Sequence, residues 1–262
     1  MDPSSPKKYH MHEFNPLALL DAYFSPKADA HLFQESTTNI MQVLHKAFTS
    51  GYVTGKTLID ISPGPIIFQL LAICEFLEEI TVLEFHDFCI KELEKWMNKE
   101  AEAFDWTHAL TFMTGLKGSS DGWDEREDMM RRKLKRIVKC DFSKDNPTDP
   151  LVLPKVDCVM SLWVLDIISK DHDTYCTNLK KISSLIKLGG YLLLCGDINA
   201  SYVTIGEHKY HFLTYDDKFL RKALSDEGYS IEHYEELERK TTSDLVDHDK
   251  VVFVIARKVK EV

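Results

Sequence analysis

The strongest constraint on the fold of this chain is an alternation of short apolar runs and helical segments from residue 57 onward. The short runs are rich in β-branched and aromatic residues, and most of the segments between them have apolar side chains at helical spacing. Strands that alternate with helices imply right-handed crossovers and a mostly parallel sheet. The expected strands cover residues 57–61, 80–85, 110–114, 137–142, 156–163, 191–197, 230–235 and 251–256.

Several of the intervening segments are predicted to be helices. One follows Asp87, which we expect as its N-cap. Another begins near Thr174, and the pair Gly189-Gly190 is expected to stop it. Residues 123–136 are expected to form an inserted helix, with acids at its start and bases near its end.

The residues ahead of the first strand have no place in such a sheet. They contain an apolar segment, residues 14–24, and a helical stretch, residues 31–48. We therefore expect residues 1–50 to form an N-terminal helical cap over an α/β core of residues 51–262. Together they would make a single domain of residues 1–262.

Composition narrows the partners of this chain. A formal net charge of −10 argues against affinity for nucleic-acid phosphates. No run approaches the ~18 apolar residues of a membrane helix, and the N-terminus lacks the apolar region of a signal peptide. The six cysteines have no CxxC spacing, and the histidines show no metal-ligand spacing. We expect a cytoplasmic monomer without metal, nucleic-acid or membrane partners.

The first expected strand, at residues 57–61, ends in the turn Ser62-Pro63-Gly64-Pro65, which leads into a helix. In an open α/β sheet, ligands bind outside the carboxyl ends of the strands, and this turn is the usual cradle. A dinucleotide needs a G-x-G-x-x-G backbone, and this turn lacks two of those glycines. A nicotinamide or flavin dinucleotide is therefore disfavoured.

Two acids follow later strands. Glu84 ends the second strand about twenty residues after the turn glycine, where nucleotide-binding α/β domains place the carboxylate that accepts ribose hydroxyls. The alternative is that Glu84 is a solvated strand end. Asp141 is positioned to accept an adenine amino proton, with Phe142 against the ring. Acids without a phosphate-binding nest favour a cationic nucleoside.

The chain resembles a known family over nearly its whole length. The segments that carry the resemblance are Phe14-Asn15-Pro16, LIDISPGPIIFQLLAICE, ELEKWMNKEAEAFDW, VKCDF, DCVMSLWVLD, TYC, LIKLGGYLLL, YVTIGEHKY and VIARK. They resemble the nicotinamide, indolethylamine and phenylethanolamine N-methyltransferases, and most of all the nicotinamide-methylating members. The resemblance implies the class I methyltransferase fold, a doubly wound seven-stranded sheet with its last strand antiparallel. It also implies a cytosolic enzyme that uses S-adenosyl-L-methionine to methylate the nitrogen of a small aromatic or arylalkyl amine.

The resemblance also implies a set of cofactor-binding positions. Several depart from the family pattern: Glu84 replaces an aspartate, Ser62-Pro63 has lost the first turn glycine, and Cys89 replaces an asparagine. The implied cofactor-binding residues are Tyr23, Phe24, Ser62, Pro63, Gly64, Phe68, Glu84, Cys89, Asp141, Phe142 and Leu162.

The implied acceptor site departs further from the family. The aspartate that holds the amide of nicotinamide aligns with Gly196, and the serine with the same role aligns with Phe212. These changes favour a more apolar or amine-bearing acceptor over nicotinamide. The implied substrate-binding residues are Leu19, Gly196, Asp197, Tyr202, Val203 and Phe212, while Trp163 is equally compatible with the acceptor wall and the core.

The expected reaction is in-line transfer of a methyl group to an amine or pyridine nitrogen, in which proximity and alignment lower the barrier. A protonated amine must first lose a proton, and Asp166 and Asp197 are the acids predicted to bind the ammonium and relay it. Two alternatives remain: a non-catalytic relative that serves as a binding module, and an NAD-dependent oxidoreductase, which the missing glycines disfavour.

Overall fold

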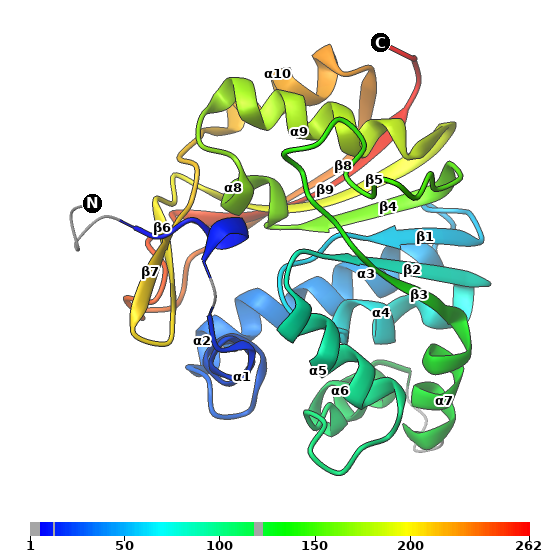
Figure 1. Ribbon diagram of the computed structural model, residues 1–262, viewed down its shortest axis with the longest axis vertical. Coiled ribbons are helices and arrows are strands. Elements are labelled where there is room, and N and C mark those ends of the chain that lie inside the picture. The colour runs from blue at the N-terminus through cyan, green and yellow to red at the C-terminus, as the bar shows by residue number, and fades with distance from the viewer. Residues whose placement is uncertain (1–5, 13, 118–122) are drawn as a thin grey trace.

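The computed structural model describes residues 6–12, 14–117 and 123–262, and its centre is a seven-stranded sheet in the order β3-β2-β1-β4-β5-β9-β8 (Figure 1). β1 pairs in parallel with β2 and β4, β2 with β3, and β4 with β5, whereas β9 runs antiparallel to both of its neighbours. This confirms the predicted doubly wound sheet with an antiparallel last strand. The strands are β1 (Thr57–Asp60), β2 (Glu79–Glu84), β3 (Leu134–Lys139), β4 (Val156–Leu162), β5 (Ile186–Ile198), β8 (Tyr229–Glu238) and β9 (Lys250–Lys258).

Helices cover the sheet, and each has a recognisable local cause. Side chains of Asp171 and Asp216 cap α9 and α10 by accepting a backbone N–H from within the first turn. The helix α5 packs against β2 and β3, α8 and α9 pack against β5, and α10 packs against β8. The helices of the core are α4 (Phe68–Ile73), the 3-10 turn η4 (Cys74–Phe76), α5 (Asp87–Met97), α6 (Thr107–Lys117), α7 (Trp123–Lys133), α8 (Val164–Ile168), α9 (His172–Ser184) and α10 (Asp217–Asp226).

The N-terminal segment and the hairpin of β6 (Tyr202–Ile205) and β7 (His208–His211) lie at the same end of the sheet (Figure 1). The Tyr23 hydroxyl joins them by donating to the carbonyls of Thr204, at 2.8 Å, and Leu245, at 3.0 Å. This segment therefore covers the carboxyl ends of the strands. Its elements are η1 (Tyr9–Met11), α1 (Pro16–Leu19), η2 (Leu20–Phe24), α2 (Ala30–Phe33), η3 (Gln34–Thr38) and α3 (Asn39–Thr49).

The prediction of a strand at residues 110–114 is wrong, because these residues lie inside α6. Leu110 and Met113 are buried, and their i, i+3 spacing places them on one helical face. The strand predicted at 137–142 begins earlier, at Leu134, directly after α7. The local apolar pattern is too short in both places to separate strand from helix.

Two predicted boundaries also change. His86, not Asp87, is the N-cap of α5, and the Asp87 carboxylate pairs instead with Lys139 at 2.6 Å. The helix α9 ends at Ser184, and Gly189 adopts a left-handed conformation five residues later, within β5. The glycine pair therefore turns the chain inside β5 and does not end the helix.

The cysteines are all free thiols, and Cys176 is the one that is exposed. Within residues 6–12, 14–117 and 123–262, no helix has both the length and the apolar character needed to cross a membrane.

Candidate active site

The turn after β1 is held by the buried Asp60. Its carboxylate accepts hydrogen bonds from Ser62 Oγ at 2.7 Å and from Gln69 Nε2, in α4, at 2.9 Å. Burial raises the pKa of Asp60 to about 7, against the opposing effect of these two donors. Gly64 has φ +74°, and a Cβ there would lie 2.4 Å from Leu19 Cδ2. The turn thus has the backbone that glycine permits and lies directly under the cap.

Glu84 lies at the carboxyl end of β2, where the ribose acid was predicted. Its Oε1 accepts the backbone N–H groups of Phe85, at 2.6 Å, and His86, at 3.0 Å. Its Oε2 is buried and makes no hydrogen bond among the described residues, although the nearby Gly64 backbone N–H lowers the pKa of Glu84. Burial raises the pKa of Glu84 to about 8. A buried carboxylate oxygen without a partner is the feature expected of a site that receives a hydroxyl group.

Tyr9, in η1, is a residue that the sequence analysis missed. Its ring packs against Phe14, Phe85 and His86, and its carbonyl lies 2.8 Å from His86 Nε2. Burial raises the pKa of its phenol, and the nearby Glu84 raises it further. The Tyr9 hydroxyl makes no hydrogen bond among the described residues, although the nearby Gly64 backbone lowers the pKa of the phenol. Tyr9 therefore lies beside the predicted ribose acid, with a polar atom left to satisfy.

Most of the remaining predicted cofactor residues lie at or after the carboxyl ends of β1 to β4. Phe68 stacks on Phe24 with ring centres 5.4 Å apart, and Phe142 contacts Phe85 at 5.7 Å. Cys89 and Leu162 are buried, at the start of α5 and the end of β4. Asp141 is exposed, and its Oδ1 accepts from Ser143 N–H and Oγ–H, which lower the pKa of Asp141.

A mostly apolar cavity adjoins the carboxyl ends of β4 and β5. Several predicted residues line it, from the cap, the first turn and the hairpin: Leu19, Tyr23, Phe24, Pro63, Asp197, Val203 and Phe212. The sequence was equally compatible with Trp163 in the acceptor wall or in the core, and in the structure Trp163 lines the cavity. The lining is completed by residues to which no sequence pattern pointed: Tyr9, Leu32, Glu35, Ser36, Ile167, Ile205, Val246, His248 and Val251. These residues come from distant segments and share no local pattern, although buried Glu35 and His248 are conspicuous once the fold is known.

Gly196 and Tyr202 were predicted to bind substrate and lie outside this lining. A Cβ on Gly196 would lie 2.1 Å from Tyr215 Oη and 3.0 Å from Asp166 Oδ2, so glycine is required there for close packing. The Tyr202 hydroxyl donates to the Asp244 carbonyl at 3.1 Å. Both residues support the wall from behind.

The two acids predicted to be catalytic occupy different positions. Asp197 lines the cavity, and its Oδ1 accepts from Trp163 Nε1 at 2.9 Å. Asp166 lies behind it, where its oxygens accept the Asp197 N–H and the Tyr215 hydroxyl, each at 3.0 Å. Burial raises the pKa of both acids. Asp166 therefore positions Asp197 and does not face the cavity.

Trp163 joins this arrangement through an unusual backbone conformation. Its φ is +56°, and its N–H donates to the Cys195 carbonyl at 2.7 Å. A tryptophan in the left-handed region is strained, and such strain is found mainly where a side chain has a functional position. Here it directs the indole toward Asp197.

The fold defines the class of protein. The structure is similar to magnesium protoporphyrin IX methyltransferase of Synechocystis PCC 6803, solved with bound S-adenosylmethionine, with a TM-score of 0.56 and 12% identity over 92% of this chain and 89% of that one. It is also similar to the glycopeptide N-methyltransferase MtfA, solved with S-adenosylhomocysteine, with a TM-score of 0.54 and 13% identity over 92% and 96% of the two chains. The chain has the fold of the S-adenosylmethionine-dependent methyltransferases.

Sequence comparison defines the family. Residues 4–259 match the model of the NNMT/PNMT/TEMT family. The chain is 34% identical to human nicotinamide N-methyltransferase, covering 97% of this chain and 96% of the relative. It is 35% identical to rabbit (Oryctolagus cuniculus) indolethylamine N-methyltransferase, covering 96% and 95%. It is 31% identical to human phenylethanolamine N-methyltransferase, covering 73% and 68%. The chain belongs to the NNMT/PNMT/TEMT family.

Proposed function

We propose that this protein is an S-adenosylmethionine-dependent N-methyltransferase that acts on a small aromatic or arylalkyl amine. The observation that carries the cofactor assignment is Glu84 Oε2, a buried carboxylate oxygen without a partner at the carboxyl end of β2. It is the acceptor that a ribose hydroxyl requires, and it lies on the strand next to the Gly64 turn. The family of the chain supports the same assignment.

The residues present suit this cofactor. Glu84 would hold the ribose, Asp141 and Phe142 would hold the adenine, and the turn at Gly64 would leave room beside the backbone. When bound, S-adenosylmethionine supplies a methyl group on a sulfonium. The protein's role is then to hold the acceptor nitrogen in line with that methyl group and to exclude water. The apolar wall of the cavity favours the exclusion of water.

The cavity also supports the acceptor class. Its wall is largely aromatic and aliphatic, and Asp197 is buried within it. This combination suits a flat or arylalkyl body that carries a basic nitrogen. Nicotinamide is less well suited, because Gly196 and Phe212 offer no polar side chain to its amide.

One observation favours the alternative of a non-catalytic relative. Tyr9 is fully buried beside Glu84, in the region expected to receive the cofactor. If this tyrosine cannot move, the cofactor cannot enter. A direct binding measurement separates the two functions.

The test is a calorimetric titration with S-adenosylhomocysteine. We expect micromolar binding that weakens about 10- to 100-fold in Glu84→Gln, because a charged acceptor is lost. The matched control is Glu79→Gln at the opposite end of the same strand, which should bind like the wild type. Labelled methyl transfer onto tryptamine, phenylethanolamine and nicotinamide then identifies the acceptor. The absence of binding at millimolar ligand would overturn the proposal and favour the non-catalytic relative.

We also propose that residues 1–262 form one domain, and that the protein is a cytoplasmic monomer without nucleic-acid partners. The N-terminal segment is joined to the hairpin by a backbone hydrogen bond of 2.8 Å from Lys7 N–H to the Lys209 carbonyl. The six free thiols suit a reducing compartment. Light scattering tests the monomer, a gel-shift titration tests nucleic-acid binding, and cell fractionation tests the compartment.

A further inference from the structure

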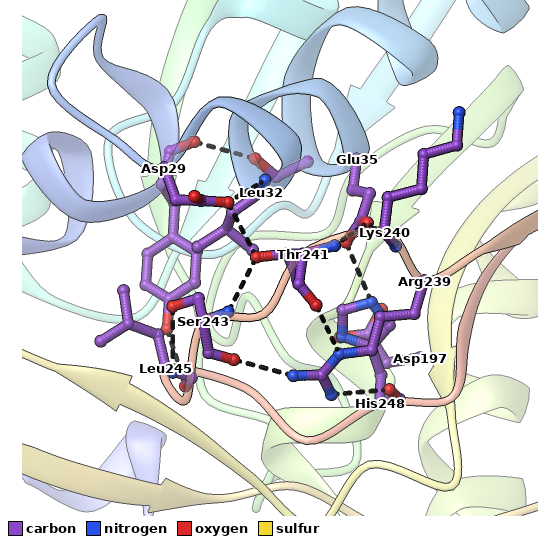
Figure 2. Close-up of polar contacts among 12 residues, drawn as sticks. Asp29, Leu32, Glu35, Asp197, Arg239, Lys240, Thr241, Ser243, Leu245 and His248 are labelled. Atoms are coloured by element: carbon purple, nitrogen blue, oxygen red, sulfur yellow. Dashed lines mark hydrogen bonds and ion pairs between the residues drawn. The ribbon is translucent and has the colours of Figure 1, made fainter.

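Three ionisable side chains meet at one end of the apolar cavity. They are Glu35 in η3, Asp197 in β5 and His248 in the segment before β9, and their exposed fractions are 2%, 5% and 2%. All three line the cavity. Figure 2 shows them with the loop that follows β8. Only Asp197 belongs to the site predicted from the sequence, so Glu35 and His248 need a separate explanation.

The hydrogen bonds of Glu35 show which form it takes. Its Oε1 accepts the backbone N–H groups of Lys240 and Thr241, and its Oε2 lies 3.1 Å from His248 Nε2 (Figure 2). Burial raises the pKa of Glu35, but these donors outweigh it and lower the pKa overall. Glu35 is therefore a carboxylate, and its Oε2 accepts a hydrogen bond from the N–H group of His248 Nε2.

This contact fixes the tautomer of His248. Because Nε2 carries a hydrogen, the lone pair of the neutral ring lies on Nδ1. Nδ1 is buried and has no hydrogen-bond partner among the described residues. A buried ring nitrogen without a partner, on a side chain that lines a cavity, is an acceptor prepared for a ligand.

The surrounding loop holds His248 in place. Arg239 donates to the His248 carbonyl at 2.9 Å, to the Thr241 carbonyl at 3.1 Å and to the Ser243 carbonyl at 2.8 Å. Thr241 Oγ1 in turn donates to Asp29 at 2.8 Å, which joins the loop to the cap. The backbone of His248 is thus held by Arg239 and its ring Nε2 by Glu35, as expected of a group that must keep one orientation.

We propose that His248 is the proton acceptor for the methyl-accepting amine, with Glu35 positioning its ring and Asp197 holding the ammonium group. This inference rests on the proposed function and narrows its substrate class. The acceptor would be an amine that is protonated at neutral pH and carried on an apolar body, in preference to a neutral pyridine.

The proposed reaction has two steps, deprotonation of the amine and methyl transfer. The ammonium transfers one proton to His248 Nδ1, and the electron pair of the broken N–H bond stays on the nitrogen. That pair forms the new N–CH3 bond, while the electrons of the S–CH3 bond remain on sulfur. The product carries the positive charge as a methylated ammonium beside Asp197, and Nδ1 returns its proton to solvent after release.

Charged groups from several elements act on His248. Burial lowers its pKa, but Glu35 and Asp197 raise it to a net value above the ordinary one, with Arg239 opposing them. The negative charge of Asp247 also raises the pKa of Asp197. Because the base must be neutral, amine methylation should rise as the pH increases through the pKa of His248.

The first test compares two acceptors in His248→Asn. With tryptamine, we expect kcat to fall about 100-fold and its rise with pH through the His248 pKa to disappear, as for loss of a general base. Methylation of a pyridine acceptor such as nicotinamide should change little, because no proton must be removed. The matched control is His233→Asn, which breaks a half-buried histidine–glutamate pair with the same 3.1 Å separation on β8. An unchanged amine rate and pH profile in His248→Asn would overturn the proposal.

The second test needs neither turnover nor a variant that folds well. In wild-type protein with ¹⁵N-labelled histidine, tryptamine hydrochloride should move one imidazole Nδ1 resonance from the unprotonated toward the protonated range. The resonance is assigned by its absence in His248→Asn or, if that variant does not fold, by its contact with Glu35 protons. No change at saturating amine would overturn the proposal. If S-adenosylhomocysteine does not bind but this shift occurs, the proposed function fails, and what remains is that His248 takes a proton from a bound amine.

Discussion

The two halves of the ligand-binding edge differ in how they are built. At β1 and β2, the polar groups belong to strand ends and the turn that follows, and Asp60, Gly64 and Glu84 lie within one strand–turn–helix–strand unit. At β5 and β9, the polar groups Glu35, Asp197 and His248 come from three elements separated by up to 213 residues. We call the first the donor half, because it holds the residues proposed to bind the methyl-donating cofactor, and the second the acceptor half. The donor half is local in sequence, and the acceptor half exists only after the chain has folded.

This difference indicates which half can accept substitutions. The donor half must fit one cofactor, and its polar groups are held by backbone geometry that few residues allow. The acceptor half is a wall of interchangeable apolar side chains with a small charged cluster at one end. A new acceptor specificity can therefore arise by substitution in the acceptor half while the donor half stays unchanged.

The largest expected effect is on the acceptor half, from Gly196→Ala. The new Cβ would lie 2.1 Å from Tyr215 Oη and 3.0 Å from Asp166 Oδ2. Over-packing of this kind should lower the free energy of unfolding by about 3 kcal/mol. Chemical denaturation measures it, with Gly115→Ala as a control because its Cβ would meet nothing within 4 Å. Equal stability of the two variants would contradict the close packing behind Asp197.

Asp197→Asn is expected to separate the two halves most clearly. The KM for an arylalkylamine should rise about 10- to 100-fold because the charge that holds the ammonium is lost. Binding of S-adenosylhomocysteine should stay within about twofold of the wild type, since Asp197 belongs to the other half. Steady-state kinetics and calorimetry measure these effects, with exposed Asp226→Asn as the control. A parallel loss of cofactor affinity would show that the halves are not independent.

Gly64→Ala perturbs the donor half. Its left-handed φ of +74° would strain an alanine by about 1–2 kcal/mol, and its Cβ would also push against Leu19. We expect S-adenosylhomocysteine to bind about tenfold more weakly, by calorimetry. Gly51→Ala has a similar φ of +77° with nothing within 4 Å, so it reports strain alone. If only stability falls, and by the same amount in both variants, the turn has no part in binding.

The smallest expected effect is a pH dependence of cofactor binding. Burial raises the pKa of Glu84 to about 8 from 4.5, so its carboxyl opposes folding increasingly as the pH rises between these values. Ribose hydroxyls need the ionised form as acceptor, so affinity for S-adenosylhomocysteine should rise about tenfold from about pH 6.5 to about pH 8.5. Glu84→Gln should abolish this rise. A wild-type affinity that is flat over this range would contradict the ribose assignment.

Much of the donor half could be predicted before folding. Glu84 ends β2 and Gly64 lies in the turn, as the strand pattern and its spacing indicate. Asp166 shows where prediction from sequence stops. Its position after the fourth strand indicates an acid of the site, but it does not predict which way the side chain points. The structure turns it toward the Asp197 N–H and Tyr215.

The sequence by itself determined the fold class and the family, and it indicated the glycine turn after β1. These depend on hydrophobic periodicity and on contiguous motifs, which a chain carries whether or not it is folded. Only the tertiary structure decided that residues 110–114 are helical, that Tyr9 lies beside Glu84, and that Glu35 and His248 meet Asp197. The physical reason is that burial and pairing of a charged side chain depend on neighbours brought by distant segments. No local pattern records which neighbours those will be.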